Sequence, residues 1–185
     1  FSNWVRRAVE SNLPWNQFAR EVITASGSTI DNGAANYFVI HKDAKLLNEA
    51  TTVTFLGLSI NCAQCHDHPL VDDYLMNDYY GLYAFLQRTY QFADKKTKKN
   101  ELAEKADGEA SFKSVFTGAS ADKVLPRLPR GQQYVEPVMA KGEEYLVAPN
   151  PKDTSIKPVP KISRRAKLAE LGRGLSVARC LGKNK

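Results

Sequence analysis

Two cysteines and a histidine stand within five consecutive residues, Cys62-Ala63-Gln64-Cys65-His66. Thiols spaced three residues apart can add to the two vinyl groups on one edge of a single porphyrin. The histidine that follows is then placed to give an imidazole nitrogen to the iron. The spacing therefore predicts covalent attachment of one haem c through Cys62 and Cys65, with His66 as the proximal iron ligand.

Three other interpretations of the same residues stay open. A Cys-x-x-Cys pair can be a redox dithiol, although no βαβ pattern surrounds this one. Cys62, Cys65, His66 and His68 could bind zinc, but four ligands within seven residues would be cramped. The cysteines could also be small buried side chains with no cofactor. We favour haem because the motif joins the thiol spacing to an adjacent imidazole.

The second iron ligand is less well specified. His41 lies about one predicted helix upstream, and Met76 and Met139 offer thioether sulfurs. His68 is only two residues from His66, so we expect it to hydrogen-bond locally and orient a neighbouring group rather than bind the opposite side of the iron. A five-coordinate iron is a further alternative, because an open iron suits small-molecule or peroxide chemistry whereas two strong ligands suit electron transfer.

The composition is that of a globular protein. Among 185 residues, 43% are hydrophobic and 25% charged, and no apolar run approaches the roughly 20 residues of a membrane-spanning helix. The net charge of +6 is scattered, with clusters around residues 95–99 and 164–167 and no basic face interleaved with aromatic residues. We therefore predict no transmembrane segment and no nucleic-acid partner, and we assign no role to Cys180, the third cysteine.

The elements predicted around the motif are mostly helical over the first ninety residues. Apolar residues recur at helical spacing before Pro14, after it, over residues 43–58 and from residue 77 onward. Here Tyr79, Tyr80 and Tyr83 could line a haem edge, although an amphipathic helix core explains them more simply. Residues 94–105 are highly charged and predict a solvated helix or a mobile loop.

Beyond this point the pattern becomes irregular. Seven of the nine prolines lie between Pro126 and Pro160, which excludes long helices and central strands there and favours loops with short strands. A last helix is predicted over residues 163–171. The sequence thus predicts a mainly α fold, with a helical haem-binding domain at 1–92, a loop-rich, Pro-rich region with short β-strands at 93–162, and the truncated start of a following domain at 163–185.

The residues around the motif resemble a known family. Phe55-Leu56-Gly57, then Cys62-Ala63-Gln64-Cys65-His66-Asp67-His68-Pro69, then Asp78-Tyr79-Tyr80-Gly81-Leu82-Tyr83-Ala84-Phe85 are similar to the planctomycete-type cytochrome-c-like domain, which occurs in large exported bacterial proteins of mostly unknown function. Lys161 to Glu170 resembles the opening of the domain that usually follows it. From Gly172 the sequence departs from that pattern, where a Trp-Leu pair would be typical. The resemblance implies a fragment of a larger exported protein.

The function predicted from these observations is electron transfer by a c-type haem domain within a larger exported protein. An enzymatic haem domain acting on external substrates, or a structural module without redox chemistry, are the alternatives, and a carrier of electrons is favoured over a catalyst in its own right. The expected partners are a redox protein or neighbouring domains of the same polypeptide. Because thioether haem is attached outside the cytoplasm, we expect a periplasmic or extracellular location.

Overall fold

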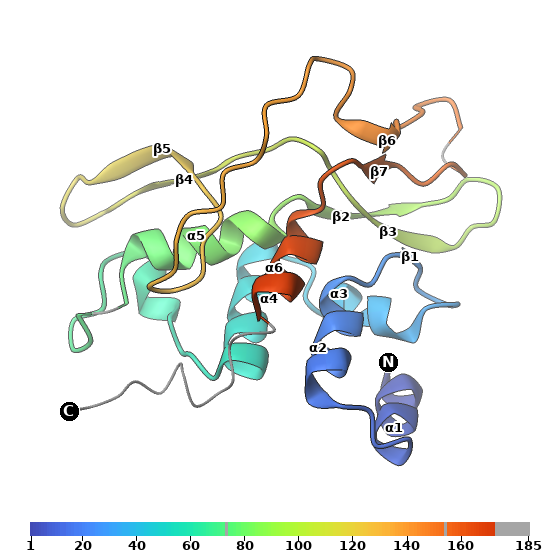
Figure 1. Cartoon of the computed structure of the whole chain (residues 1–185), viewed down its shortest axis with the longest axis horizontal. Coiled ribbons are helices and arrows are strands. Elements are labelled where there is room, and N and C mark those ends of the chain that lie inside the picture. Colours follow the sequence, from blue (N-terminus) through green and yellow to red (C-terminus); the bar gives the residue numbers. More distant parts are fainter. Residues whose placement is uncertain (73, 154, 173–185) are drawn as a thin grey trace.

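The computed structural model describes residues 1–72, 74–153 and 155–172, and Cys180 lies outside them. Figure 1 shows the elements of this part of the chain. Its helices are α1 (Ser2–Glu10), α2 (Trp15–Ile23), α3 (Asn36–Ile40), α4 (Ala44–Thr51), α5 (Met76–Leu86) and α6 (Arg164–Gly172), with short helical turns η1 (Gly33–Ala35), η2 (Thr52–Leu56) and η3 (Asn61–Gln64). Its strands are β1 (Gly27–Ser28), β2 (Thr89–Ala93), β3 (Asn100–Glu104), β4 (Ala110–Lys113), β5 (Ser120–Val124), β6 (Tyr145–Val147) and β7 (Val159–Pro160).

The strands form three small antiparallel sheets. Their orders are β1-β3-β2, β4-β5 and β6-β7. Of the described residues 37% are helical and 16% are in strands, so the fold is mixed α/β and the prediction of a mainly α fold was wrong. In Figure 1 the strands lie above the helices, and the β2–β3 and β4–β5 hairpins extend toward opposite ends of the molecule.

The error arose mainly at residues 89–104. The charged stretch predicted to be a helix or mobile loop is instead the turn and second strand of a hairpin, in which Thr89 pairs with Glu104 and Ala93 with Asn100. Lysines crowd the turn because its tip faces water, and they hide the short strands on either side from a search for apolar periodicity. The burial of Leu102 and Ala103 on β3 anchors the hairpin to the core.

Helix α5 is the centre of the core. Tyr79, Leu82, Ala84, Phe85 and Leu86 on this helix are each no more than 1% exposed. Helices α4 and α6, the turn η3 and strands β4 and β5 all pack on it. A helix that is apolar on nearly every side must be covered on every side, and this one is.

Local sequence explains where the helices before the motif begin and end. The Asp43 carboxylate accepts hydrogen bonds from the backbone N–H groups of Lys45 and Leu46 at the start of α4. The helical stretch continues through η2 and ends at Gly57, whose φ of 66° is left-handed, a conformation that glycine adopts without strain. The helix predicted over residues 43–58 is therefore confirmed, and the chain then turns into the cysteine motif.

Helix α6 brings the end of the described chain back into the core. Leu168 and Ala169 are buried in the same hydrophobic cluster as α2 and α5. Arg164 is fully buried, and its guanidinium pairs with Glu136 at 2.8 Å and Glu109 at 2.9 Å. The neighbouring Arg165 donates to the carbonyl oxygen of Ala25 at 2.6 Å. Residues from all three predicted segments thus share one core, and the division into domains at 92 and 162 stays a prediction.

No helix within the described ranges is both long enough and apolar enough to cross a bilayer.

Candidate functional site

The two cysteine thiols lie exposed on a single helical turn. Cys62 is within η3 and Cys65 directly follows it, and neither is in a disulfide. The backbone N–H groups of Cys65 and His66 both donate to the carbonyl oxygen of Cys62, at 3.2 and 3.3 Å. These bonds hold the three side chains of the motif on one turn. Two accessible thiols with an adjacent imidazole are the arrangement that thioether attachment of haem requires.

The imidazole of His66 is held in a defined orientation. Its Nδ1 lies 2.7 Å from the carbonyl oxygen of Asp67. A carbonyl oxygen can only accept, so Nδ1 is the donor, and Nε2 is the nitrogen that can bind a metal. This is how a protein fixes the tautomer of a metal-binding histidine. His66 is half-buried and lines a cavity.

A cavity of about 280 Å³ adjoins the His66 ring. One wall comes from the segment after the motif, with Leu75 and the buried Met76, and the other comes from the β4–β5 hairpin, with Phe112 and Ser114. The loop between His66 and α5 is closed by the Asp67 carboxylate, which accepts from the backbone N–H of Met76 at 2.8 Å. The structure therefore brings two of the predicted iron ligands, His66 and Met76, to one cavity.

Two tyrosines of α5 hold the middle of the motif. Tyr80 donates from its hydroxyl to the carbonyl oxygen of Gln64 at 3.0 Å, and Tyr79 to the side-chain oxygen of Gln64 at 3.3 Å. Burial raises the pKa of both hydroxyls, and the nearby Cys65 thiol adds to the effect on Tyr80, so both remain protonated donors. The interpretation of these tyrosines as helix core, with hydroxyls at its edge, agrees with their burial.

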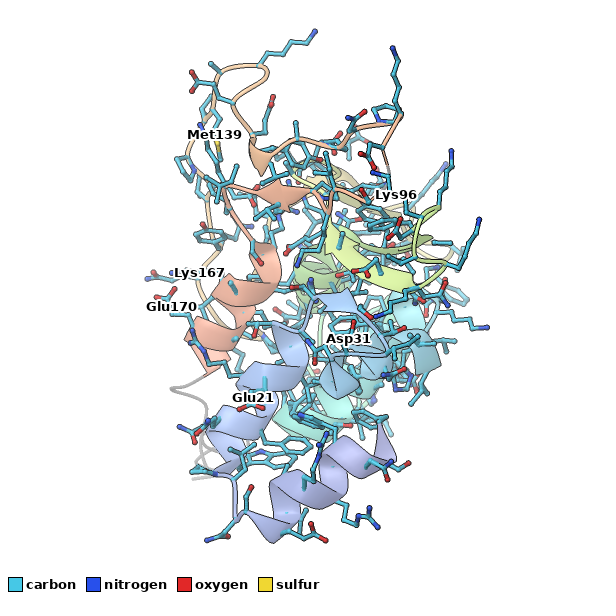
Figure 2. The ribbon with its side chains drawn as sticks, turned by 90° about the vertical axis from the view of Figure 1, so that its right-hand side faces the viewer. Glu21, Asp31, Lys96, Met139, Lys167 and Glu170 are labelled. Atoms are coloured by element: carbon cyan, nitrogen blue, oxygen red, sulfur yellow. The ribbon has the colours of Figure 1, made fainter. Side chains whose placement is uncertain are left out.

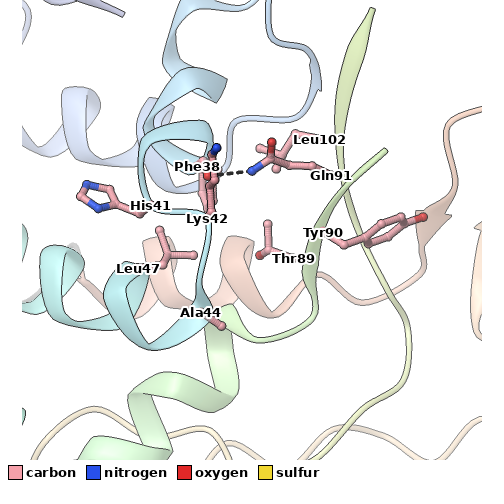
Figure 3. Close-up of a pocket in the computed structure, with 9 residues that line it drawn as sticks. All are labelled: Phe38, His41, Lys42, Ala44, Leu47, Thr89, Tyr90, Gln91 and Leu102. Carbon is pink, nitrogen blue, oxygen red and sulfur yellow. Dashed lines mark hydrogen bonds between the residues drawn. The ribbon is translucent and has the colours of Figure 1, made fainter. Parts of the chain in front are cut away.

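The other predicted iron ligands lie elsewhere. His41 lines a different cavity of about 380 Å³, between the α3–α4 connection and strand β2, and shares no lining residue with the cavity of His66. Figure 3 shows the His41 ring directed away from Thr89 and Gln91, and it packs edge-on against Tyr37 with 4.8 Å between centroids. Burial lowers the pKa of His41, which keeps it neutral near pH 7.

Met139 and His68 are also not gathered at the His66 cavity. Figure 2 places Met139 on the long segment before β6, and it lines a third cavity together with Arg88 and Glu136. His68 accepts from the backbone N–H of Leu70 at 3.2 Å and packs edge-on against Tyr74. It organises the loop after the motif, while Asp67 orients His66. Sequence reasoning missed Asp67, although its position next to the motif was the clue.

The residues present fit a thioether-bound haem better than a preformed zinc site. Within the described ranges no three side chains from His, Cys, Asp and Glu are gathered as metal ligands. A zinc site needs about four such donors around one point. Covalently held haem needs only one imidazole on the iron, because the two thiols bond to the porphyrin instead.

These features lie in a stretch that matches a known family model over residues 1–91, described as PSCyt2, a protein of unknown function. The first half of the chain matches PSCyt2. This is a planctomycete cytochrome-c-like domain family, so the family resemblance seen in the sequence is confirmed over those residues. No curated protein and no solved structure matches the chain.

The PSCyt2 match contains the motif and Met76 but ends before the β4–β5 hairpin. One wall of the His66 cavity therefore comes from residues outside the matched stretch. The resemblance of residues 161–170 to a following domain also lies outside it and stays a prediction.

Proposed function

We propose that this chain attaches one haem c through Cys62 and Cys65 and serves as an electron-transfer module of a larger exported protein. The observation that carries the proposal is the pair of exposed, unpaired thiols on one turn beside an imidazole whose Nδ1 is engaged and whose Nε2 is left for a metal. The cytochrome-like character of the PSCyt2 family supports it.

The attachment needs no co-reactant beyond haem. Each thiol adds across one vinyl double bond: the sulfur bonds to one vinyl carbon, its proton ends on the other, and nothing leaves. When bound, the iron supplies a one-electron couple between its ferric and ferrous states. The electron must come from, and pass to, a redox partner protein or neighbouring domains of the same polypeptide.

Within this proposal His66 is the proximal ligand through Nε2. Of the side chains suggested for the second position, Met76 has the best support, because it alone of those considered shares the cavity of His66. His41 would need a rearrangement to leave its own cavity. Two ligands favour electron transfer over catalysis, since catalysis needs an open position on the iron.

The test is the intact mass of the chain produced by export in a host that matures c-type cytochromes. Because no atom leaves on attachment, the mass should rise by the whole of one haem, about 616 Da. The reduced protein should also show a sharp α-band at about 550 nm. The chain is exported in this experiment because we propose a periplasmic or extracellular location for the protein.

A matched set of cysteine variants identifies the thiols. The double variant C62S/C65S should lose all covalent haem, whereas C180S, which removes the remaining cysteine, should keep it. A wild-type protein that matures without the added mass and band, while a control cytochrome in the same cells acquires both, would rule out the proposal.

A further inference from the structure

The β4–β5 hairpin places apolar side chains beside the haem motif. The ring of Phe116, in the turn of this hairpin, packs edge-on against the His66 ring with 5.3 Å between centroids. Phe116 nevertheless remains 73% exposed, and its neighbour Val115 is 76% exposed. Removing apolar surface from water is favourable by about 25 cal/mol per Å², so an uncovered Val-Phe pair at a tip calls for an explanation.

The turn itself does not require these residues, because the same turn occurs in the β2–β3 hairpin with other residues at its tip. The side chains of Asp94 and Ser114 begin the two turns by accepting from the backbone N–H two residues later. A threonine follows at the same place in each, Thr97 and Thr117, and its hydroxyl accepts from the N–H two residues on.

Both turns also close in the same way. The N–H of the first residue donates across the turn at 2.9 Å in one hairpin and 2.7 Å in the other. The fifth residue is left-handed in both, with φ 59° at Lys98 and 71° at Gly118. The tip positions of the first turn hold two exposed lysines, Lys95 and Lys96, and the Lys96 ammonium lies 2.9 Å from the Asp153 carboxylate.

The apolar tip is also fixed relative to the motif. Ser114, only 3% exposed, donates from its hydroxyl to the carbonyl oxygen of Cys65 at 3.5 Å. On the adjoining strand Phe112 stacks on Tyr80, with 5.1 Å between centroids, and Tyr80 in turn bonds Gln64 between the two cysteines. These contacts set the tip beside His66, so the Phe116 ring lies against the site and Val115 is the residue next to it in the turn.

We propose that Val115 and Phe116 cover the haem held at Cys62 and Cys65, so that the haem site is built from both halves of the chain. The inference rests on the proposed function, and haem is the occupant because it is the apolar group whose attachment points adjoin this tip. Such a cover would exclude water from the porphyrin, which raises the reduction potential by disfavouring the more highly charged ferric state.

The experiment uses the exported, haem-loaded protein. The variant V115S/F116S should keep the added mass of haem but have a lower midpoint potential than the wild type. L146S, which removes an exposed leucine from β6, is the matched control and should leave the potential unchanged. In a second measurement, 4-fluorophenylalanine at position 116 should give a ¹⁹F resonance broadened by ferric iron, while the same label at position 92, in the β2–β3 hairpin, stays sharp.

The fluorine measurement needs no destabilising substitution, so it decides the matter even where the double variant fails to mature. The inference alone is overturned if the haem-loaded protein shows an unchanged potential and equally sharp resonances at positions 116 and 92. The apolar tip would then be a contact surface for a protein partner. A wild-type chain that carries no haem overturns the proposed function and this inference together.

Discussion

At the scale of single residues, two backbone hydrogen bonds to the carbonyl oxygen of Cys62 hold the thiols and the imidazole of the motif on one turn. The spacing of Cys62, Cys65 and His66 predicts haem attachment with no knowledge of the fold. Asp67 orients His66 through its backbone carbonyl oxygen. Ser114 lines the cavity and contacts Cys65, which is 49 positions away in the sequence. No periodicity reports such contacts, so only the folded chain reveals them.

The choice between second iron ligands is testable at this scale. In the haem-loaded protein, M76L removes the thioether sulfur while nearly keeping the side-chain volume. If Met76 binds the iron, this variant should bind carbon monoxide in the ferrous state and cyanide in the ferric state at least about tenfold more readily than the wild type. The measurement is a visible-spectrum titration with each ligand.

The matched variant for this prediction is H41L, which should titrate like the wild type because His41 lines a separate cavity. The opposite pattern, with an opened iron in H41L and a closed one in M76L, would assign the second position to His41.

At the scale of elements, the helices were predicted well and the hairpins poorly. Helices are local, and caps such as Asp43 mark their ends. The β2–β3 and β4–β5 hairpins carry mixed residues on short strands, and their shared six-residue turn becomes evident only when backbone hydrogen bonds are compared. The docking of α6 was also unforeseen, because it depends on buried ion pairs between Arg164 and two distant glutamates.

These ion pairs predict a dependence of stability on pH. Burial alone would raise the pKa of Glu136, but hydrogen bonds and charges from Arg164 and Arg88 outweigh it and hold the pKa below the ordinary 4.5. A lowered folded-state pKa stabilises the protein above the unfolded value, and this stabilisation disappears as the pH falls through the folded value. The free energy of unfolding should therefore decrease as the pH falls below about 4.5.

Replacing the carboxyl isolates this contribution. E136Q should reduce the free energy of unfolding at pH 7 by about 2–3 kcal/mol, because Arg164 and Arg88 stay buried with one partner fewer. In urea titrations followed by circular dichroism, the free energy of unfolding of E136Q should also decrease less steeply on acidification than that of the wild type. E143Q removes a carboxyl that is exposed and should change neither quantity. Parallel pH profiles for E136Q and the wild type would contradict the assignment.

At the scale of the whole molecule, the match to PSCyt2 ends at residue 91 while the core does not. Leu102, Val124 and Leu168 lie beyond that point and are buried with the residues of α5. Composition predicted a globular chain correctly but could not show which segments share a core. This sharing is a property of tertiary packing, and it bears directly on the predicted division at residue 92.

The division can be tested with the fragment 1–92. If the later residues are needed to cover α5, this fragment should lose cooperative unfolding in urea, while the chain of 172 residues retains it. Circular dichroism at a helix wavelength gives the measurement. A fragment that unfolds cooperatively, at the same urea concentration as the longer chain, would establish residues 1–92 as an independent domain.

The accessibility of both thiols, one in η3 and one directly after it, has a consequence for biogenesis. In an oxidising compartment, neighbouring cysteines tend to form a disulfide. A polypeptide exported before haem is attached would then lose two hydrogen atoms as the disulfide forms. It would not react with the vinyl groups until a reductant cleaved this disulfide. Maturation would thus depend on the supply of electrons as well as porphyrin, and preparations lacking colour should regain competence after treatment with dithiothreitol.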